Sequence, residues 1–378
     1  MALITYLTKI QFDFGAIKLL PAEMGLLGMK RPLLVTDQGV LQSGLVERVI
    51  HAIGSNEKPS IFADTPANPT ESACRAALEQ FREQACDGLI ALGGGSAMDL
   101  AKAVALWASH GGDSLKPYMM VEGGVQRITA NIHPVIAIPT TAGTGSEVGR
   151  GAVIVLDDGR KLALVSPHLI PKLALCDPEL TLDLPAAMTA GTGMDAMAHC
   201  IETFVAPSIN PPAEAIARDG MIKVFNYLER AVHGGHDRDA RWNMMMAAME
   251  GAMAFQKGLG AVHALSHPLG ALKSPRLHHG TLNAIFLPPV LRFNGPVLGD
   301  KLQRLATVFA VKADIDAIAK VIEDLNRRIG LPQKLSELGV DRSQFDSIAS
   351  QALLDHCHGT NPRQATHADY VKILEDVY

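Results

Sequence analysis

The chain has 378 residues, of which 48% are hydrophobic and 19% charged, an ordinary globular composition that is long enough for two domains. Its formal net charge is −5, from 34 Lys+Arg against 39 Asp+Glu, and the basic residues are scattered. Because there is neither a basic cluster nor an apolar run of about 18 residues, we expect no nucleic-acid partner and no membrane span.

The start of the chain and the cysteines indicate the cellular compartment. The segment 1–15 lacks the basic flank and the continuous apolar stretch of a secretory signal. The five cysteines have wide, irregular spacing, which suits neither a disulfide framework nor a CxxC metal site. We therefore expect a cytoplasmic protein in which these thiols are reduced and packed: Cys74, Cys86, Cys176, Cys200 and Cys357.

From Ile10 to about Pro178, short apolar runs alternate with helical periods. Strands that alternate with helices predict a parallel sheet covered by helices on both faces. The segment 152–165 differs, because two apolar strands around an Asp-Asp-Gly turn predict a hairpin, appended to that sheet as an antiparallel element. The expected order is strand 33–37, helices near 41–53 and 70–85, strand 88–96, helix 97–108, strand 134–141 and the hairpin.

After the segment 184–188 the strand pattern ends, and Ala, Met and Leu at helical spacing continue to the C-terminus. The sequence therefore predicts an α/β domain over 1–182 and an all-helical domain over 183–378. Methionines are frequent at 242–255, and we interpret them as core residues rather than as part of a cofactor site.

A glycine-rich turn, GGGSAMDLAK at 93–102, joins a buried strand to a helix. Such a turn presents backbone N–H groups at the positive end of the helix, which suits a pyrophosphate. A second polar loop, 139–147, follows the next strand, so both loops lie at the carboxyl ends of parallel strands, where ligands bind. The alternative for the first turn is a tight corner in which Ser96 caps the helix and Asp99 completes a capping box.

Asp37 ends the earlier strand at 33–37. An acidic residue at a strand end can accept hydrogen bonds from an adenosine ribose and repel a 2′-phosphate, so NAD is preferred over NADP. The alternative is that Asp37 caps the helix that follows.

Metal-binding residue types recur at helical spacing in the second half. Asp195 and His199 are four residues apart, so a helix places both on one face. His263 and His267 repeat that spacing, and His279 begins another helical segment. One carboxylate and several histidines from three segments predict a divalent metal site, and a ligand set without thiolate suits Fe(II), Zn(II), Co(II) or Mn(II).

The sequence resembles the iron-containing (group III) alcohol dehydrogenases in seven blocks that follow family order. The resemblance implies a Rossmann-like α/β N-terminal domain and an all-α C-terminal domain, the arrangement also seen in dehydroquinate synthase, with the active site between them. The blocks are GGGSAMDLAK, IPTTAGTGSEV, DPELTLDLP, AAMTAGTGMDAMAHCIE, GAVHALSHPLGA, HHGTLNAIFLP and TNPRQAT.

This resemblance implies an NAD(H)-linked, metal-dependent enzyme that interconverts a small alcohol and its aldehyde. The expected metal is Fe(II), with Zn(II) as the alternative, and the helical domain is expected to hold both metal and substrate. The resemblance assigns the metal ligands to Asp195, His199, His263 and His279, and a proton-relay role to His267, for which the alternative is an orienting role at the metal site.

Cofactor contacts carry over in the same way, residue by residue. The pyrophosphate turn falls on Gly94, Gly95, Ser96 and Asp99. The nicotinamide side falls on Thr140, Thr141 and Ser146, and a ribose-contacting lysine falls on Lys161.

One departure from the family pattern concerns the substrate. Many members read GSEVT, whereas this chain reads GSEVGRGAV, and within the family it is most similar to the 4-hydroxybutyrate dehydrogenases. Arg150 can hold a substrate carboxylate through two parallel hydrogen bonds, with Gly149 and Gly151 leaving room for the chain of a hydroxy acid. The alternative is that Arg150 lies on the hairpin surface and pairs with Asp157 or Asp158.

Other functions remain as alternatives. Within the family, the substrate can be an uncharged alcohol or diol, as for a lactaldehyde reductase or a 1,3-propanediol dehydrogenase. A dehydroquinate synthase-like lyase would need a basic cluster for a phosphorylated substrate, and the metal-site segments have only Lys273 and Arg276. A non-catalytic filament protein would not need an intact ligand set. We expect a small-molecule substrate and a homodimer.

Overall fold

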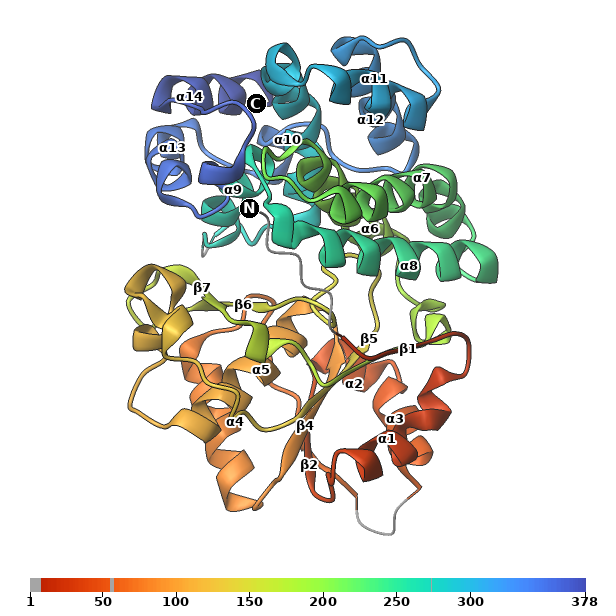
Figure 1. Cartoon of the computed structure of the whole chain (residues 1–378), viewed down its shortest axis with the longest axis vertical. Helices are drawn as coiled ribbons and strands as arrows, with labels where there is room; N and C mark the ends of the chain where they lie inside the picture. The colour runs from red at the N-terminus through yellow and green to blue at the C-terminus, as the bar shows by residue number, and fades with distance from the viewer. Residues whose placement is uncertain (1–7, 55–57, 273) are drawn as a thin grey trace. The chain divides into compact units, whose positions relative to one another are not determined.

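The computed structural model of the chain describes residues 8–54, 58–272 and 274–378, which form two compact units (Figure 1). The N-terminal unit contains the described residues up to Thr141 together with Gly145–Thr181, and the C-terminal unit contains Ala142–Thr144 and Leu182–Tyr378. Residues 1–7 and Lys273, which the sequence analysis considered, lie outside the described residues.

The N-terminal unit contains a six-stranded sheet in the order β1-β8-β5-β4-β2-β3, and every pair in it is parallel. This confirms the predicted α/β class. The central strands are continuous apolar runs, as expected of strands that are covered on both faces. The strands are β1 (Ile10–Phe12), β2 (Pro32–Val35), β3 (Ser60–Phe62), β4 (Gly88–Gly93), β5 (Val135–Pro139) and β8 (Leu173–Cys176).

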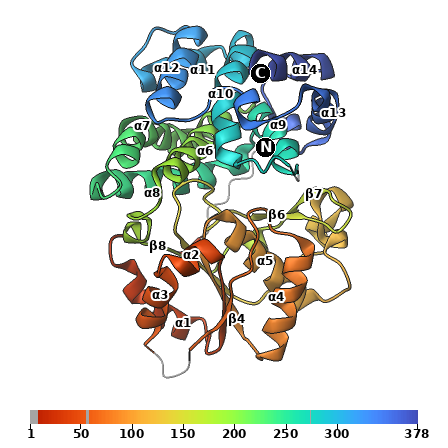
Figure 2. The same cartoon turned by 180° about the vertical axis from the view of Figure 1, so that it is seen from behind.

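Two hydrophobic cores lie on opposite faces of this sheet, because successive side chains of a strand point to opposite faces. Leu33 of β2 packs with α4 and α5, whereas its neighbour Leu34 packs with α1 and α3. Figure 2 shows α4 and α5 on one side of β4 and α1 and α3 on the other. The helices are α1 (Leu20–Leu26), α2 (Gln38–Gln42), α3 (Leu45–Ile53), α4 (Glu71–Glu83) and α5 (Gly95–His110).

The neighbouring strands β2 and β4 lead into helices on opposite faces. The segment after β2 leads into α2 and α3, whose core is on one face, and β4 leads into α5, whose core is on the other. Such a topological switch point is where parallel sheets bind ligands. Asp37 and the 93–96 turn therefore both lie at the switch point.

Two local predictions were correct only in part. The helix expected near 41–53 is divided into α2 and α3 at Gly44, which has a φ of 79°. The hairpin, β6 (Gly151–Val155) paired with β7 (Lys161–Val165), is antiparallel as predicted but forms a separate two-stranded sheet. Its apolar side chains, including Ile154 and Leu164, pack into the core with α4 and α5, so it extends that core rather than the sheet.

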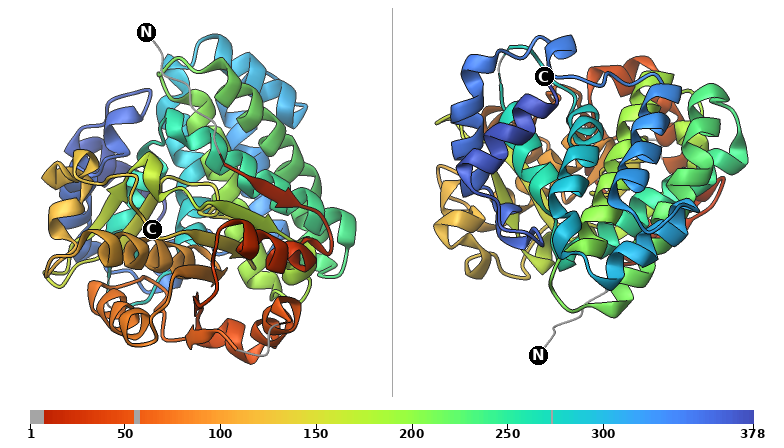
Figure 3. Two further views of the ribbon diagram at one scale, coloured as in Figure 1. Left: turned by 60° about the horizontal axis from the view of Figure 1, so that its bottom comes forward. Right: turned by 90° about the horizontal axis from the view of Figure 1, so that it is seen from above.

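In the C-terminal unit all the regular elements among the described residues are helices, as predicted. The right-hand view of Figure 3 shows its green to blue helices. They are α6 (Ala186–Val205), α7 (Pro211–His233), α8 (Arg238–Ala254), α9 (Ala261–Gly270), α10 (His279–Asn294), α11 (Asp300–Phe309), α12 (Ile315–Arg328), α13 (Phe345–Leu354) and α14 (His367–Asp376). Among the helices that the structure describes, none is both long and apolar enough to cross a membrane.

Candidate metal and cofactor sites

Close helix packing brings the predicted metal ligands together. Helix α6 carries Asp195 and His199 one turn apart, and α10 begins at His279. A Cβ added to Gly280 would lie 2.1 Å from the carbonyl oxygen of Gly191, so the backbones of α10 and α6 are in direct contact there. The glycines thus let the first turn of α10 approach the Asp195 side chain.

Three of the four predicted ligands, the histidines, surround one carboxylate oxygen of the fourth, Asp195. The Nε2 atoms of His199, His263 and His279 each lie 3.6 Å from Oδ1 of Asp195. Ligand atoms of Asp195, His263 and His279 lie within 4.8 Å of one another, and His199 falls outside that mutual limit. The arrangement is therefore tightest for three of the four residues.

Burial and charge at this cluster suit a divalent cation. Asp195, His199 and His263 are 2%, 5% and 1% exposed. Burial acts to raise the pKa of Asp195, but His199 and His279 outweigh it and hold that pKa well below its ordinary range. Burial lowers the pKa of His199 to about 4, so its imidazole is neutral and has a free lone pair. A neutral imidazole beside an ionised carboxylate supplies nitrogen and oxygen donors that suit Fe(II) or Zn(II).

Two residues that sequence analysis missed support the cluster. Nδ1 of His263 donates to Oε2 of Glu202 at 2.5 Å, which leaves Nε2 facing Asp195. Nδ2 of Asn283 donates to Oδ1 of Asp195 at 2.7 Å, while the buried Oδ1 of Asn283 has no hydrogen-bond partner among the described residues. Buried polar atoms are normally paired, so this orphaned oxygen also fits a site that holds a ligand.

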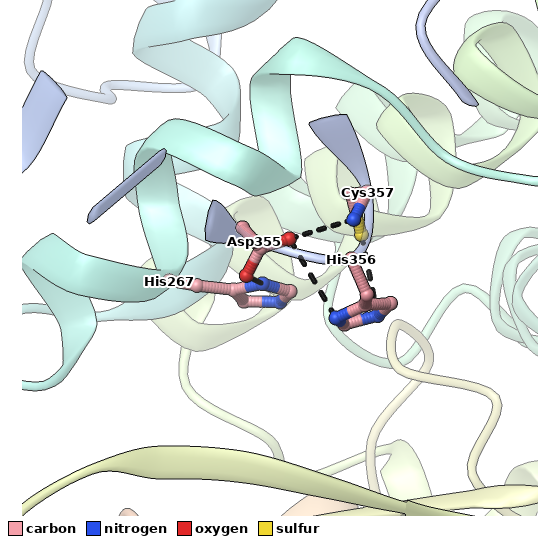
Figure 4. A group of neighbouring side chains, drawn as sticks. All are labelled: His267, Asp355, His356 and Cys357. Carbon is pink, nitrogen blue, oxygen red and sulfur yellow. Dashed lines mark hydrogen bonds and ion pairs between the residues drawn. The ribbon is translucent and has the colours of Figure 1, made fainter. Parts of the chain in front are cut away.

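His267 lies beside the cluster and has its own carboxylate partner. Its ring stacks on that of His279, with centroids 5.5 Å apart. Its Nδ1 donates to Oδ2 of Asp355 at 2.8 Å, and Figure 4 shows this pair with the neighbouring His356 and Cys357. No local spacing signal could have identified Asp355, which lies 88 residues from His267.

In the N-terminal unit, the glycine-rich turn begins α5 without a side-chain cap. The N-cap residue is Gly94. The alternative in which Ser96 caps the helix and Asp99 completes a box is wrong, because Ser96 Oγ donates to the carbonyl of Ala67 and Asp99 accepts from Ser146 Oγ at 2.7 Å. Among the described residues, no side chain caps the first turn of α5, so its N–H groups can serve an anion.

Asp37 caps α2, since its Oδ1 accepts from the N–H of Val40 at 3.0 Å. This was the alternative reading of the residue. Its second oxygen faces the glycine-rich turn, because a Cβ added to Gly93 would lie 3.6 Å from it. A Cβ on Gly94 would lie 3.3 Å from Oγ1 of Thr141, so Asp37 and Thr141 both border the turn.

A buried lysine that sequence analysis missed anchors the second polar loop. Nζ of Lys102 donates to Ser146 Oγ at 2.7 Å and to the carbonyls of Gly149 and Gly151 at 3.0 and 2.8 Å. Burial lowers the pKa of Lys102 to about 8. Ser146 in turn donates to Asp99, so Ser146 and Asp99 both have polar partners inside the protein. The cofactor role of Ser146 and Asp99 stays a prediction.

The remaining predicted positions lie in the same unit. Thr140 is buried directly after β5, and Lys161 begins β7 and donates to Oδ1 of Asn68 at 2.9 Å. Arg150 is exposed directly before β6.

The alternative pairing of Arg150 was wrong. Asp157 pairs with Arg75 at 3.0 Å and Asp158 with Arg160 at 2.7 Å, and the structure gives Arg150 neither partner.

Comparisons with known proteins match the whole chain. The family model described as iron-containing alcohol dehydrogenase matches residues 8–178, and that of the C-terminal part of the family matches residues 189–378. A 4-hydroxybutyrate dehydrogenase of Cupriavidus necator is 54% identical, covering 99% of each chain. A 1,3-propanediol dehydrogenase of Klebsiella pneumoniae is 34% identical, covering 97% of this chain and 96% of its own.

Solved structures agree with these sequence matches. The structure of a sulfoacetaldehyde reductase from Bifidobacterium kashiwanohense in complex with NAD⁺ has a TM-score of 0.89 and 30% identity. It covers 100% of this chain and 99% of its own.

Proposed function

The chain belongs to the iron-containing alcohol dehydrogenase family, and we propose that its substrate pair is 4-hydroxybutyrate and succinate semialdehyde. The chain is an oxidoreductase of the alcohol dehydrogenase type. The convergence of three histidine Nε2 atoms at 3.6 Å from one Asp195 oxygen carries the proposal of a metal-dependent reaction. The 54% identity to a 4-hydroxybutyrate dehydrogenase supports the choice of substrate.

We assign a divalent metal, Fe(II) or else Zn(II), to Asp195, His199, His263 and His279. The donor set fits such an ion, because it combines one ionised carboxylate with imidazoles in a buried setting. When bound, the ion would supply a Lewis acid for the oxygen of the substrate. Glu202 holds His263 in the tautomer whose Nε2 faces the other donors.

NAD is assigned to the N-terminal unit, where it would accept the hydride from the carbinol carbon. The first-turn N–H groups at Gly94, Gly95 and Ser96 suit its pyrophosphate. Asp37 borders the turn and favours NAD over NADP through its negative charge. The remaining proposed contacts are Asp99, Thr140, Thr141, Ser146 and Lys161.

His267 is the proposed acceptor of the proton from the alcohol. Burial acts to raise the pKa of Asp355, but His267 outweighs it and keeps the carboxyl ionised. An ionised Asp355 accepts a hydrogen bond from Nδ1–H of His267, which leaves the lone pair of Nε2 to take up the substrate proton.

Arg150 is the proposed partner of the substrate carboxylate. It is exposed, and the acidic residues of its hairpin pair with Arg75 and Arg160 instead. A guanidinium can hold a carboxylate by two parallel hydrogen bonds, and Gly151 beside it adds no side chain.

The substrate proposal is tested by NADH formation with metal-loaded enzyme on 4-hydroxybutyrate and on butanol. Arg150→Ala should cost 4-hydroxybutyrate about 1.5–3 kcal/mol in kcat/KM, the range for hydrogen bonds to charged groups, and should leave butanol nearly unchanged. Arg160→Ala is a matched control, because Arg160 lies on the same hairpin and is paired with Asp158. Equal losses on both substrates would show that Arg150 serves the fold or the cofactor, and activity on uncharged alcohols alone would favour a generic alcohol or diol dehydrogenase.

A further inference from the structure

A second group of metal-ligating side chains lies in the C-terminal unit. His267 of α9 meets Asp355, His356 and Cys357, which lie in the segment between α13 and the short helix that begins at His358. One ligand atom from each of the four lies within 4.8 Å of the others. Figure 4 shows both imidazoles and the thiol gathered around the Asp355 carboxylate. These four residues are called the His267 cluster below.

Two of the donor atoms already have the spacing of a tetrahedral site, and all four lie within 4.8 Å of one another. Bond lengths of about 2.0 Å to nitrogen and 2.3 Å to sulfur place tetrahedral ligands roughly 3.3–3.6 Å apart. Nε2 of His356 lies 3.4 Å from Sγ of Cys357, which is the spacing of two ligands of one ion. The other ring nitrogen of His356, Nδ1, faces Asp355 at 3.6 Å and would stay outside the coordination shell if Nε2 binds. Nδ1 of His267 is 2.8 Å from Oδ2 of Asp355, a hydrogen bond that would lengthen slightly around an ion.

The His267 cluster is accessible to solvent at His356, and a hydrogen bond orients its carboxylate. The His356 side chain is 36% exposed, whereas those of His267 and Asp355 are each 14% exposed and Cys357 is 2% exposed. The Cys357 N–H donates to Oδ1 of Asp355 at 2.8 Å, which orients the carboxylate. A soluble ion can therefore enter past His356 to donors that are already positioned.

We propose that the His267 cluster is a second divalent-cation site that prefers zinc and inhibits the enzyme. Zinc is favoured because the cluster adds a thiolate to imidazole and carboxylate. Binding would exchange water molecules of the hydrated ion for Sγ of Cys357, one nitrogen of each imidazole and an oxygen of Asp355. The S–H proton of Cys357 would go to solvent and the proton of His267 would move from Nδ1 to Nε2, with no change of oxidation state. The inhibition rests on the proposed role of His267 in proton transfer, whereas the binding site does not.

Cobalt(II) substitution tests the site directly. Thiolate–cobalt coordination gives a near-ultraviolet charge-transfer band, and the Asp195 cluster offers no sulfur ligand to produce one. Wild-type enzyme should bind about two ions per chain and show the band. Cys357→Ser should lose it. His356→Gln alters an exposed side chain and should not affect folding. It should lower the affinity for the ion at the His267 cluster by about tenfold or more, since removing even an indirect partner of a metal costs that much affinity.

Matched variants separate the site from general effects. His358→Gln changes a histidine two positions away that bonds Tyr370 instead, and Cys86→Ser changes a cysteine of the N-terminal unit, so both should keep the band. Excess zinc should inhibit wild-type turnover, and His356→Gln should keep the basal rate and resist that inhibition. A folded wild type that shows no band, or a band that persists in Cys357→Ser, would overturn the site.

The kinetic and spectroscopic outcomes are independent. A band without zinc inhibition would reject the inhibitory role and retain the site. Absence of dehydrogenase activity would reject the proposed function and leave the band as the measure of the site.

Discussion

Glu202 illustrates how a single residue tunes the metal cluster. Its Oε2 accepts from Nδ1 of His263 at 2.5 Å, and its Oε1 accepts from the N–H of Val262 at 2.7 Å. Burial opposes a charge on His263, but Glu202 outweighs it and raises the pKa of His263 to about 9. Glu202 therefore fixes the direction of the imidazole and increases the negative charge that a cation would neutralise.

Glu202→Gln should lower metal affinity by about 10–100-fold, because partners of metal ligands typically contribute that much. His263→Ala should abolish both metal retention at the Asp195 cluster and turnover. Metal content by plasma emission and competition with a chelator measure the two effects. Glu229→Gln, which alters an exposed carboxylate paired with Arg328, is the control. Unchanged metal content in His263→Ala would refute the ligand assignment.

Glu147 is a buried carboxylate of the second polar loop, and burial raises its pKa to about 7. Since its ordinary value is 4.5, the wild-type protein should lose stability as pH rises from about 4.5 through about 7, where the folded protein must ionise a buried acid. Glutamine does not titrate. Glu147→Gln should therefore gain up to about 3 kcal/mol relative to wild type between pH 4.5 and pH 8.

Urea unfolding at several pH values measures this gain. Trp107 of α5 reports on the N-terminal unit if Trp242 is first replaced by Phe. Glu83→Gln changes an exposed acid of α4 and should give no comparable pH-dependent difference. A stability difference that is flat across this range would mean that Glu147 titrates normally.

At the scale of helices, the contact between α6 and α10 sets the geometry of the metal cluster. Gly191 and Gly280 meet where an added Cβ would approach a carbonyl oxygen to 2.1 Å. Backbone atoms cannot yield as a flexible side chain can, so a methyl group there must push the helices apart. Because His279 directly precedes Gly280, that displacement would move a proposed ligand.

Gly280→Ala should destabilise the protein by about 1–3 kcal/mol and also weaken metal binding. Thermal unfolding and metal titration test the two effects. Gly25→Ala in α1 is the control, because an added Cβ there meets nothing within 4 Å, and alanine should be neutral or slightly stabilising in that helix. Normal metal affinity in Gly280→Ala would show that the close contact does not position His279.

At the scale of the whole molecule, the proposed binding sites for NAD and for the metal ion belong to different units. The glycine-rich turn lies in the N-terminal unit, and the four proposed metal ligands lie in the C-terminal unit. Each ligand should stabilise the folded state that binds it, by about 2.7 kcal/mol at a concentration of one hundred times Kd.

Hydrogen exchange can locate these effects. NAD should increase protection in the first turn of α5 and at the loop after β5, whereas the metal should increase it in α6, α9 and the start of α10. Protection by NAD that is confined to the helical segments would contradict the cofactor assignment.

Sequence alone determined the fold class and the positions of the longer elements, because helical and strand periodicities are local. The change from alternating strands and helices to helices alone near residue 184 appears in the structure as predicted. The i, i+4 spacing of Asp195 and His199 identified a metal-binding face for the same reason. The short strands β1, β3 and β8 were missed, since strands of three or four residues carry little periodic signal.

Tertiary structure decided which side chains serve which partner. Glu202 reaches His263 across 61 residues, and Asp355 reaches His267 across 88, so no local pattern could pair them. Asp99 fits a capping box by spacing, yet it accepts hydrogen bonds from Ser146 and Val153 because the hairpin packs against α5. Local spacing determines which residues share a face, whereas long-range packing determines what that face meets.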